Sequence, residues 1–381
     1  MAKRYIIIGS GAAGLEAATA IRTADSLGNI TVVSEESWPY YSRIRIGEVV
    51  DGRSEPDKLA LRLPNWYDEQ KINLLLKSRV TQIVHAKKQV QLADGQLLDY
   101  DSLLIATGAR PFVPNFPGSD LAKTLRFMAD AVALRQAIAG VKRAVVIGGG
   151  LLGLELAASL AKAGLAVTVV ERNNRLLPSQ LDLVAGELVL ELLQRQGIDF
   201  VLPASTAQIR QENNGLSVDM DDGCSLPADL VLVSAGVRPA IELAQAAGIE
   251  VDQGILINDQ MQTSIPGIYA AGDCAEHRGQ LYGIWPASSE QGRFAGRAMA
   301  GLDVTYAGTT RMVTLKVAEI GVFSMGKTGD EDGEVQAERS GDDYKRLVRD
   351  ENGVLIGATL VGDLSERRHI LMALTAGKPY P

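Results

Sequence analysis

Two glycine-rich stretches have the spacing that dinucleotide phosphates require. Each follows the pattern Gly-x-Gly-x-x-Gly between a β-branched run and a segment with helical spacing of apolar residues. The first glycine allows a tight turn, the second lets backbone NH groups approach a pyrophosphate, and the third permits close packing of helix on strand. The helix N-terminus then favours the phosphate charge. The predicted phosphate loops contain Gly9, Gly11, Ala12, Ala13 and Gly14 in the first copy, and Gly148, Gly150, Leu151, Leu152 and Gly153 in the second.

An acidic residue follows each loop at the end of the next apolar run. Glu35 and Glu171 are placed to accept hydrogen bonds from adenosine ribose hydroxyls. Glu171 would also repel a 2′-phosphate, which favours NADH over NADPH, although Arg172 directly after it would partly accommodate that phosphate. Glu36 is a further candidate cofactor contact, and it fits a solvated strand end equally well.

The elements around these loops are repeated along the chain. Residues 5–18 and 144–158 read as the same strand-turn-helix unit, and the Gly-x-Arg-Pro ending of 103–111 returns at 230–239. A long repeat with two copies indicates duplicated domains. We therefore predict an α/β fold with two Rossmann-like domains. The expected boundaries are 1–110 with 241–310 for the first dinucleotide-binding domain, 111–240 for the second, and 311–381 for a small C-terminal α+β domain.

Finer elements are predicted between these landmarks. Residues 74–92 and 200–220 read as hairpins, and 286–297 reads as a helix that begins at a proline. In the C-terminal part, strand-like runs at 312–323, 344–349 and 355–361 precede a helix near 365–376.

Composition narrows the class of protein. The chain has 381 residues, 46% apolar and 22% charged, so it is a folded globular protein rather than a disordered or fibrous one. The 38 basic and 46 acidic residues give a net charge of −8, which argues against nucleic acid as the main partner. Two unpaired cysteines and three scattered histidines predict neither a disulfide nor a metal site. Without a signal peptide or a credible membrane span, we expect a cytoplasmic location.

Two dinucleotide sites in one chain suggest two cofactors that react with each other, as a nicotinamide and a flavin do in hydride transfer. The motifs IATGARP at 105–111, SAGVRP at 234–239 and YAAGDCAE at 269–276 resemble those of the FAD-dependent pyridine nucleotide oxidoreductases with two dinucleotide-binding domains. The segments PYYSRIRIGEV at 39–49, LRFMADA at 125–131, GIWPASSEQG at 283–292 and LKVAEIGVFSMG at 315–326 resemble NADH:rubredoxin reductases and the flavin-containing part of NADH-dependent nitrite reductases.

This resemblance implies that the two domains are of the glutathione-reductase type, with an FAD-binding domain at 1–110 with 241–310 and an NAD-binding domain at 111–240. It also implies roles for individual residues. Glu155 would lie near the nicotinamide, and the helix that starts at Trp285 and Pro286 would stabilise negative charge on the reduced flavin. Arg43 would lie against the flavin or its phosphates, and we expect catalytic roles for Glu155, Arg43 and Lys316. The remaining residues expected at the cofactors are Val80, Ala106, Thr107, Gly108, Arg126, Ala235, Gly236, Gly272 and Asp273.

The chain departs from its relatives at two points. It has no cysteine between residues 1 and 223, so the thiol chemistry of disulfide reductases and NADH peroxidases is not expected at the flavin. Some relatives place a lysine five residues after the matching arginine, where this chain has Glu48. A lysine-dependent argument about the flavin therefore does not transfer.

The predicted activity is oxidation of NADH through FAD, with electrons passed to a small redox protein, rubredoxin above others. The alternatives are the electron-input portion of a nitrite-reducing system, an NADH oxidase, and a redox-sensing flavoprotein. Because rubredoxins are acidic, we expect a local positive patch of Arg43, Arg45 and Lys316 where electrons leave. A short C-terminal domain favours a monomer or a weak homodimer.

Overall fold

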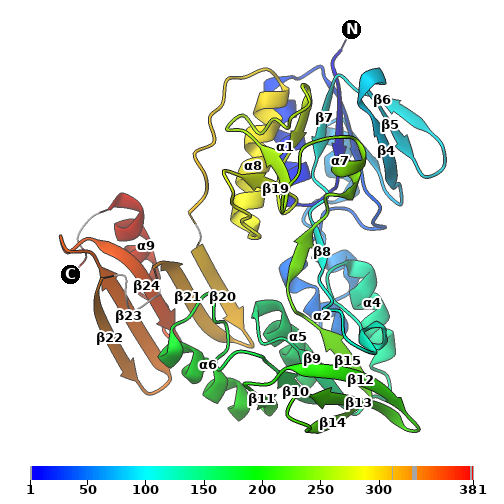
Figure 1. The fold of residues 1–381 in the computed structure, drawn as a ribbon. Helices are drawn as coiled ribbons and strands as arrows, with labels where there is room; N and C mark the ends of the chain where they lie inside the picture. The colour runs from blue at the N-terminus through cyan, green and yellow to red at the C-terminus, as the bar shows by residue number, and fades with distance from the viewer. Residues whose placement is uncertain (1, 311, 328–332, 378–379, 381) are drawn as a thin grey trace.

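The computed structural model describes residues 2–310, 312–327, 333–377 and 380, and for 313–317 the backbone alone. The chain forms two parallel-sheet bodies and a smaller C-terminal body. Figure 1 shows the C-terminal strands beside α5 (Leu151–Lys162) and α6 (Leu183–Arg195) of the second body. No helix among the described residues is long and apolar enough to cross a membrane.

The first sheet is entirely parallel, with the order β18-β7-β1-β2-β3. The inner strands β1 and β7 are buried on both faces, as a sheet covered by helices on both sides requires. The strands are β1 (Arg4–Ile8), β2 (Asn29–Val33), β3 (Ile72–Leu75), β7 (Ser102–Ile105) and β18 (Ile268–Ala270), and the helices packed near them include α1 (Ala12–Ala24), α3 (Pro64–Glu69), α7 (Glu242–Ala246) and α8 (Trp285–Met299).

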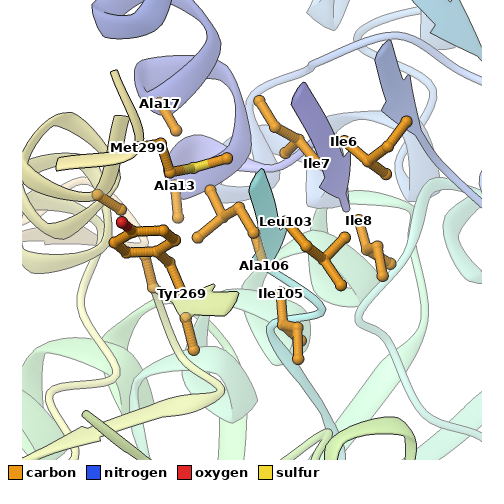
Figure 2. Packing of buried hydrophobic residues seen from close by; sticks show 14 of the residues in the cluster. Ile6, Ile7, Ile8, Ala13, Ala17, Leu103, Ile105, Ala106, Tyr269 and Met299 are labelled. Atoms are coloured by element: carbon orange, nitrogen blue, oxygen red, sulfur yellow. The ribbon is translucent and has the colours of Figure 1, made fainter. Parts of the chain in front are cut away.

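Helices α1 and α8 pack closely because small residues face each other. A Cβ atom on Gly292 would lie 2.2 Å from the carbonyl oxygen of Ala13, and one on Gly296 would lie 2.4 Å from that of Ala17. Figure 2 shows Ala13 and Ala17 beside Met299, with the side chains of β1 and β7 completing this core. This packing sets the start of α8 beside the first glycine loop.

The second sheet repeats the plan with the order β11-β10-β9-β15, again parallel. Its elements are β9 (Arg143–Ile147), α5 (Leu151–Lys162), β10 (Ala166–Val170), α6 (Leu183–Arg195), β11 (Ile198–Val201) and β15 (Leu230–Val233), with the antiparallel strands β12 (Thr206–Glu212), β13 (Gly215–Met220) and β14 (Ser225–Ala228) against it.

Short strands and helices connect and extend the two bodies. The antiparallel pair β8–β16 runs between them, as Figure 1 shows. These elements are α2 (Gly47–Val50), β4 (Val80–Val84), β5 (Gln89–Leu92), β6 (Leu97–Asp99), β8 (Ala109–Pro111), α4 (Met128–Ala137), β16 (Val237–Pro239), β17 (Ile255–Ile257) and β19 (Ala275–His277), with short 3₁₀ turns at Arg43–Arg45, Pro56–Leu59, His85–Lys87 and Ser119–Leu121.

The C-terminal body is α+β, as predicted. Its sheet has the order β20-β21-β24-β23-β22 and packs against α9. Ser324 donates to the carbonyl oxygen of Gln180 at 2.6 Å, and Tyr344 donates to Asp182 at 3.2 Å. These hydrogen bonds connect the C-terminal body to the second body. Its elements are β20 (Met312–Val317), β21 (Ile320–Gly326), β22 (Glu334–Ser340), β23 (Asp343–Arg349), β24 (Leu355–Val361) and α9 (Arg367–Ala376).

Several predicted elements are wrong in detail. The segment 74–92 is not one hairpin, because Ile72–Leu75 joins the first parallel sheet and the hairpin begins at Val80. Phe200 likewise belongs to β11 in the second sheet. The run 312–323 is two strands, since Ala318 and Glu319 adopt positive φ and turn the chain. Helix α8 begins at Trp285, one residue before Pro286.

Candidate functional site

A cavity of about 1090 Å³ joins the two parallel-sheet bodies, and both glycine loops reach it. It lies at the carboxyl ends of the strands, where open α/β sheets bind their ligands. The predicted site residues that line it are Gly9, Gly11, Ala12, Ala13, Glu35, Glu36, Arg43, Val80, Ala106, Thr107, Gly108, Arg126, Gly150, Leu151, Leu152, Glu155, Gly236, Gly272, Asp273, Trp285 and Pro286.

The first glycine loop has the geometry of a phosphate cradle. Gly9 has a φ of +112°, and a Cβ there would lie 2.1 Å from the carbonyl oxygen of Ala106. A Cβ on Gly14 would lie 2.0 Å from the carbonyl oxygen of Gly9. At Gly11, by contrast, no described atom lies within 4 Å of a Cβ, so that glycine leaves space for a ligand rather than for the protein.

The second loop shows the same division of roles. Cβ atoms on Gly148 and Gly153 would lie 2.3 Å from the carbonyl oxygen of Ser234 and 2.0 Å from that of Gly148, whereas one on Gly150 would meet nothing within 4 Å. Gly11 and Gly150 are the N-caps of α1 and α5, and no side chain caps either helix. The free NH groups of both first turns therefore suit an anionic ligand, and the residues fit two dinucleotides.

A charged cluster lies between the two bodies. The guanidinium of Arg126 donates to Asp273 at 2.7 Å, and Ser288 donates to the other oxygen of that carboxylate at 2.9 Å. The Nε of Arg126 is buried without a hydrogen-bond partner, so one donor is left for a bound group. Gly272 precedes Asp273 with a φ of +89°, and its NH donates to Gln291 at 2.8 Å.

Arg43 is held inside the cavity rather than on an outer surface. It pairs with Glu36, donates to the carbonyl oxygen of Arg126 at 3.0 Å, and lies over the rings of Tyr41 and Phe127. Tyr41 also donates to Glu36. Glu36 is therefore an internal ion-pair partner, and the reading of it as a solvated strand end is wrong.

The predicted positive patch is not assembled as expected. Arg43 is neutralised by Glu36, and Arg45 is exposed but forms two hydrogen bonds with Glu48, at 2.9 and 2.7 Å. Lys316 lies on β20, and its side chain is outside the described residues. Instead, large apolar side chains are exposed at the cavity, with Ile44 66% and Trp285 51% accessible. Trp285 donates to the hydroxyl of Tyr40 at 2.8 Å.

Other predicted residues lie outside the cavity lining. Gly14, Gly148 and Gly153 serve packing, as their close approaches indicate. Glu171 is only 6% exposed and accepts a hydrogen bond from the NH of Gly149 at 2.7 Å. Arg172 and Ala235 are exposed beside the second loop.

Sequence reasoning missed several residues of the site. Tyr40, Tyr41, Arg110, Phe127 and Ser288 all line the cavity. Ser288 had a visible signal, since it stands one helical turn from the start of a predicted helix. Arg110 lies on the short strand β8, and the others come from loops whose course depends on tertiary contacts.

The part of the chain that the structure describes has no cluster of three potential metal ligands. Cys274 is buried, with its thiol near the carbonyl oxygens of Ile105 and Ala271, and Cys224 is exposed after β13. Neither cysteine lines the cavity.

Glu155 is a cavity carboxyl whose pKa is raised well above its ordinary value. It lies in the second turn of α5, and burial raises the pKa of its carboxyl from 4.5 to about 7. Near neutral pH it therefore exists in both protonation states, as a group that binds or releases a proton at this site would need.

We expect Glu155→Gln to raise the melting temperature at about pH 8 more than at about pH 5. Between pH 4.5 and about 7 the folded protein binds more protons at this residue than the unfolded chain does. Its contribution to stability consequently falls as pH rises through that window, and glutamine removes the effect. Thermal unfolding across a pH series tests this, with Glu187→Gln on the exposed side of α6 as control. An equal shift at both pH values would contradict it.

Two glycine loops on parallel sheets that share one cavity define a two-dinucleotide oxidoreductase. Comparison with known families agrees: residues 3–292 match the pyridine nucleotide-disulphide oxidoreductase model, and residues 312–378 match the rubredoxin NAD⁺ reductase C-terminal domain. The chain belongs to the pyridine nucleotide-disulphide oxidoreductase family of flavoprotein reductases.

Individual relatives align with nearly the whole chain. An assimilatory nitrate reductase electron transfer subunit from Bacillus subtilis is 34% identical over 98% of this chain and 49% of its own length, and a nitrite reductase (NAD(P)H) from the same organism is 36% identical over 96% and 46%. The chain thus spans about half the length of these relatives. Among solved structures, an NAD-dependent persulfide reductase from A. fulgidus has a TM-score of 0.89 and 29% identity, covering 99% of this chain and 77% of that one. NADH:rubredoxin oxidoreductase from Clostridium acetobutylicum has a TM-score of 0.83 and 26% identity, covering 100% and 97%.

Proposed function

We propose that this protein oxidises NAD(P)H through a bound FAD and passes the electrons to a small redox protein, with rubredoxin the first candidate. The observation that carries the proposal is the single cavity lined by Gly11 of one loop and Gly150 of the other. A nicotinamide and a flavin bound by these loops would meet there.

We assign FAD to residues 1–110 and 241–310, and the nicotinamide nucleotide to 111–240. The NH groups at the start of α1 would hold the FAD pyrophosphate, and Glu35, at the cavity edge, would accept from the adenosine ribose. Arg126 and Asp273 would hold the polar middle of the cofactor. NADH as the preferred donor stays a prediction from the sequence, and the ratio of kcat/KM for NADH and NADPH measures it.

FAD bound here would supply hydride acceptance from NAD(P)H and release of electrons one at a time. The protein's own contributions are orientation and electrostatics. The N-terminus of α8 places a partial positive charge at the cavity, and Glu155 supplies a carboxyl that titrates near neutral pH. Tyr40, Trp285 and Leu152 present apolar surface that limits water.

The match of residues 312–378 to the rubredoxin reductase C-terminal domain supports rubredoxin as acceptor. A role as the electron-input part of a nitrite-reducing system is the second candidate, because two relatives of nitrate and nitrite reduction align over nearly the whole chain. An NADH oxidase from Methanocaldococcus jannaschii is 34% identical over 86% of the chain, which keeps direct oxygen reduction as a further candidate. A redox-sensing role would instead leave a long-lived reduced complex with NAD(P)H.

Stopped-flow absorbance separates these functions. We expect rapid flavin reduction by NADH, followed by fast reoxidation on addition of rubredoxin and slow reoxidation by oxygen alone. Oxygen turnover as fast as rubredoxin turnover would favour the oxidase. Absence of flavin from the purified protein, with no uptake of added FAD, would refute the proposal.

We expect surface charge near the cavity to affect the second half-reaction, in which the reduced flavin passes electrons to the acceptor protein. Arg45 is exposed next to the apolar residue Ile44 and pairs with Glu48, so Arg45→Glu would leave two carboxylates at this point of the surface. It should therefore slow reduction of an acidic acceptor without a comparable effect on flavin reduction by NADH. Exposed charges steer encounter and are screened within ~8 Å at physiological ionic strength, so added salt should shrink the difference. Lys87→Glu, on the exposed 3₁₀ turn His85–Lys87, is the control. If the rate of electron transfer to the acceptor did not depend on salt concentration, a charged docking site would be contradicted.

A further inference from the structure

One face of the C-terminal sheet carries a row of buried polar side chains. Ser324 of β21 lies opposite Thr359 of β24, and Thr359 lies opposite Arg346 of β23 in the next pair of strands. Side chains of directly opposite residues share one face of a sheet, so these three form a line across three strands. None of them is more than 5% exposed. We call these three residues the polar row.

The apolar neighbours show which way the polar row faces. Phe323, next to Ser324 in sequence, belongs to the apolar core that includes Ile370 of α9. Val322, two positions before Ser324, belongs instead to the core of the second body. Because side chains alternate between the two faces along a strand, the polar row faces the second body.

The polar row meets a short segment between β10 and α6, residues 176–182, which we call the bridging turn. Ser324 donates to the carbonyl oxygen of Gln180 at 2.6 Å. Tyr344, which lies on the same face of the sheet, donates to the carboxylate of Asp182 at 3.2 Å. The C-terminal body thus holds the bridging turn through a backbone carbonyl and a side chain.

Buried polar groups are not the most stable way to join two bodies. Asp182 is 9% exposed, and its carboxylate lies 3.9 Å from the guanidinium of Arg346. Neither Oδ2 of Asp182 nor the hydroxyl of Thr359 has a hydrogen-bond partner among the described residues, and buried groups without partners are unfavourable. Replacing such groups by apolar side chains of similar volume is often neutral or stabilising. What the polar row adds is direction, because its donors fix one position for the segment that accepts from them.

A chain of hydrogen bonds leads from the bridging turn to the second glycine loop. The NH of Gln180 donates to the carbonyl oxygen of Leu177 at 2.9 Å, and the NH of Leu177 donates to that of Gly149 at 3.3 Å. Gly149 is the middle residue of the loop, and its own NH donates to Glu171 at 2.7 Å. Leu177 is fully buried. The hydroxyl of Ser324 is therefore connected to the glycine loop through two residues of the bridging turn.

We propose that the C-terminal body sets how tightly the second glycine loop binds its nucleotide, and that Ser324 and Tyr344 are positioning residues that act through the bridging turn. The inference rests on the proposed binding of NAD(P)H by that loop, where the NH groups at the start of α5 would hold the pyrophosphate. Neither positioning residue lines the cavity, whereas Gln180 does. Their effect on the nucleotide is therefore indirect.

Ser324→Ala and Tyr344→Phe each remove one donor to the bridging turn, and Gln196→Ala is the matched control. Gln196 of the second body donates to the carbonyl oxygen of Ala318 in the C-terminal body at 2.9 Å, so it joins the same two bodies away from the bridging turn. We expect Ser324→Ala and Tyr344→Phe to weaken calorimetric binding of ADP-ribose to the FAD-loaded protein on the order of fivefold each. Gln196→Ala should bind ADP-ribose as the parent does.

Two further readouts separate positioning from a general loss of structure. In stopped-flow reduction of the flavin, the NADH concentration at half of the limiting rate should rise in Ser324→Ala, whereas the limiting rate and the FAD content should stay near those of the parent. Without nucleotide, hydrogen exchange at the amides of Gly149 and Leu177 should become faster in Ser324→Ala and not in Gln196→Ala, because the bonds that protect these amides open more often.

Parental affinity for ADP-ribose in both Ser324→Ala and Tyr344→Phe would overturn the inference. An equal loss of affinity in Gln196→Ala would overturn it as well, since any contact between the two bodies would then have the same effect. Failure of the parent protein to bind ADP-ribose would instead refute the proposed function.

Discussion

Gly11→Val should yield a folded protein that does not retain FAD, whereas Gly150→Val should retain FAD that NADH no longer reduces efficiently. At both positions the backbone is extended, with φ of −76° and −78°, so valine is sterically allowed. A Cβ at either site meets no described atom within 4 Å. The new side chains therefore fill only the space where a pyrophosphate would approach the NH groups.

Gly14→Val is the matched control for the first loop. A Cβ there would lie 2.0 Å from the carbonyl oxygen of Gly9, so we expect loss of the folded state rather than selective loss of FAD. Flavin content, circular dichroism and stopped-flow reduction by NADH distinguish the three variants. Full FAD occupancy in Gly11→Val, or normal reduction kinetics in Gly150→Val, would refute the assignment of the two loops.

Gly292→Val should destabilise the whole first body and lower its FAD content. A Cβ at this position would lie 2.2 Å from the carbonyl oxygen and 2.7 Å from the Cα of Ala13. These are backbone atoms of α1 beside the glycine loop, so α8 or the loop must shift. Overpacking of this kind lowers the free energy of unfolding by about 3 kcal/mol. Here it would also displace the first glycine loop.

Urea unfolding monitored by flavin fluorescence and by circular dichroism measures both effects. Arg297→Ala is the control, because this residue is exposed on the same helix. We expect the control to stay within about 0.5 kcal/mol of the parent. A Gly292→Val protein with parental stability would show that α1 and α8 do not pack as closely as described.

The sequence by itself determined the class of fold and the two glycine loops. Glycine spacing, β-branched runs and the repeat at 5–18 and 144–158 are local features, and the backbone conformations they require are realised at Gly9 and Gly148. The motif GIWPASSEQG likewise predicted a helix near Pro286. Residues with such local constraints are recognisable because the chain has few other ways to satisfy them.

The tertiary structure alone decided which side chains meet across the bodies. Arg126 and Asp273 are 147 positions apart in sequence, and the fold brings them together beside Ser288 of α8, which donates to the same carboxylate. Arg43 is drawn inside by Glu36 rather than left on a docking patch. Such pairings depend on long-range packing, which local patterns do not encode.

The acids after the two loops show most clearly what the sequence determines and what only the tertiary structure decides. In sequence, Glu35 and Glu171 read as equivalents. The NH groups of Ser34 and Glu171, however, make the equivalent backbone hydrogen bonds to the ends of β3 and β11, so Glu171 corresponds to Ser34 and Arg172 corresponds to Glu35. A strand reverses the facing of its side chains with every residue, so an offset of one position changes which side chain faces the ligand. The sequence determined that an acid follows each loop, and only the register of the sheets decided what that acid does.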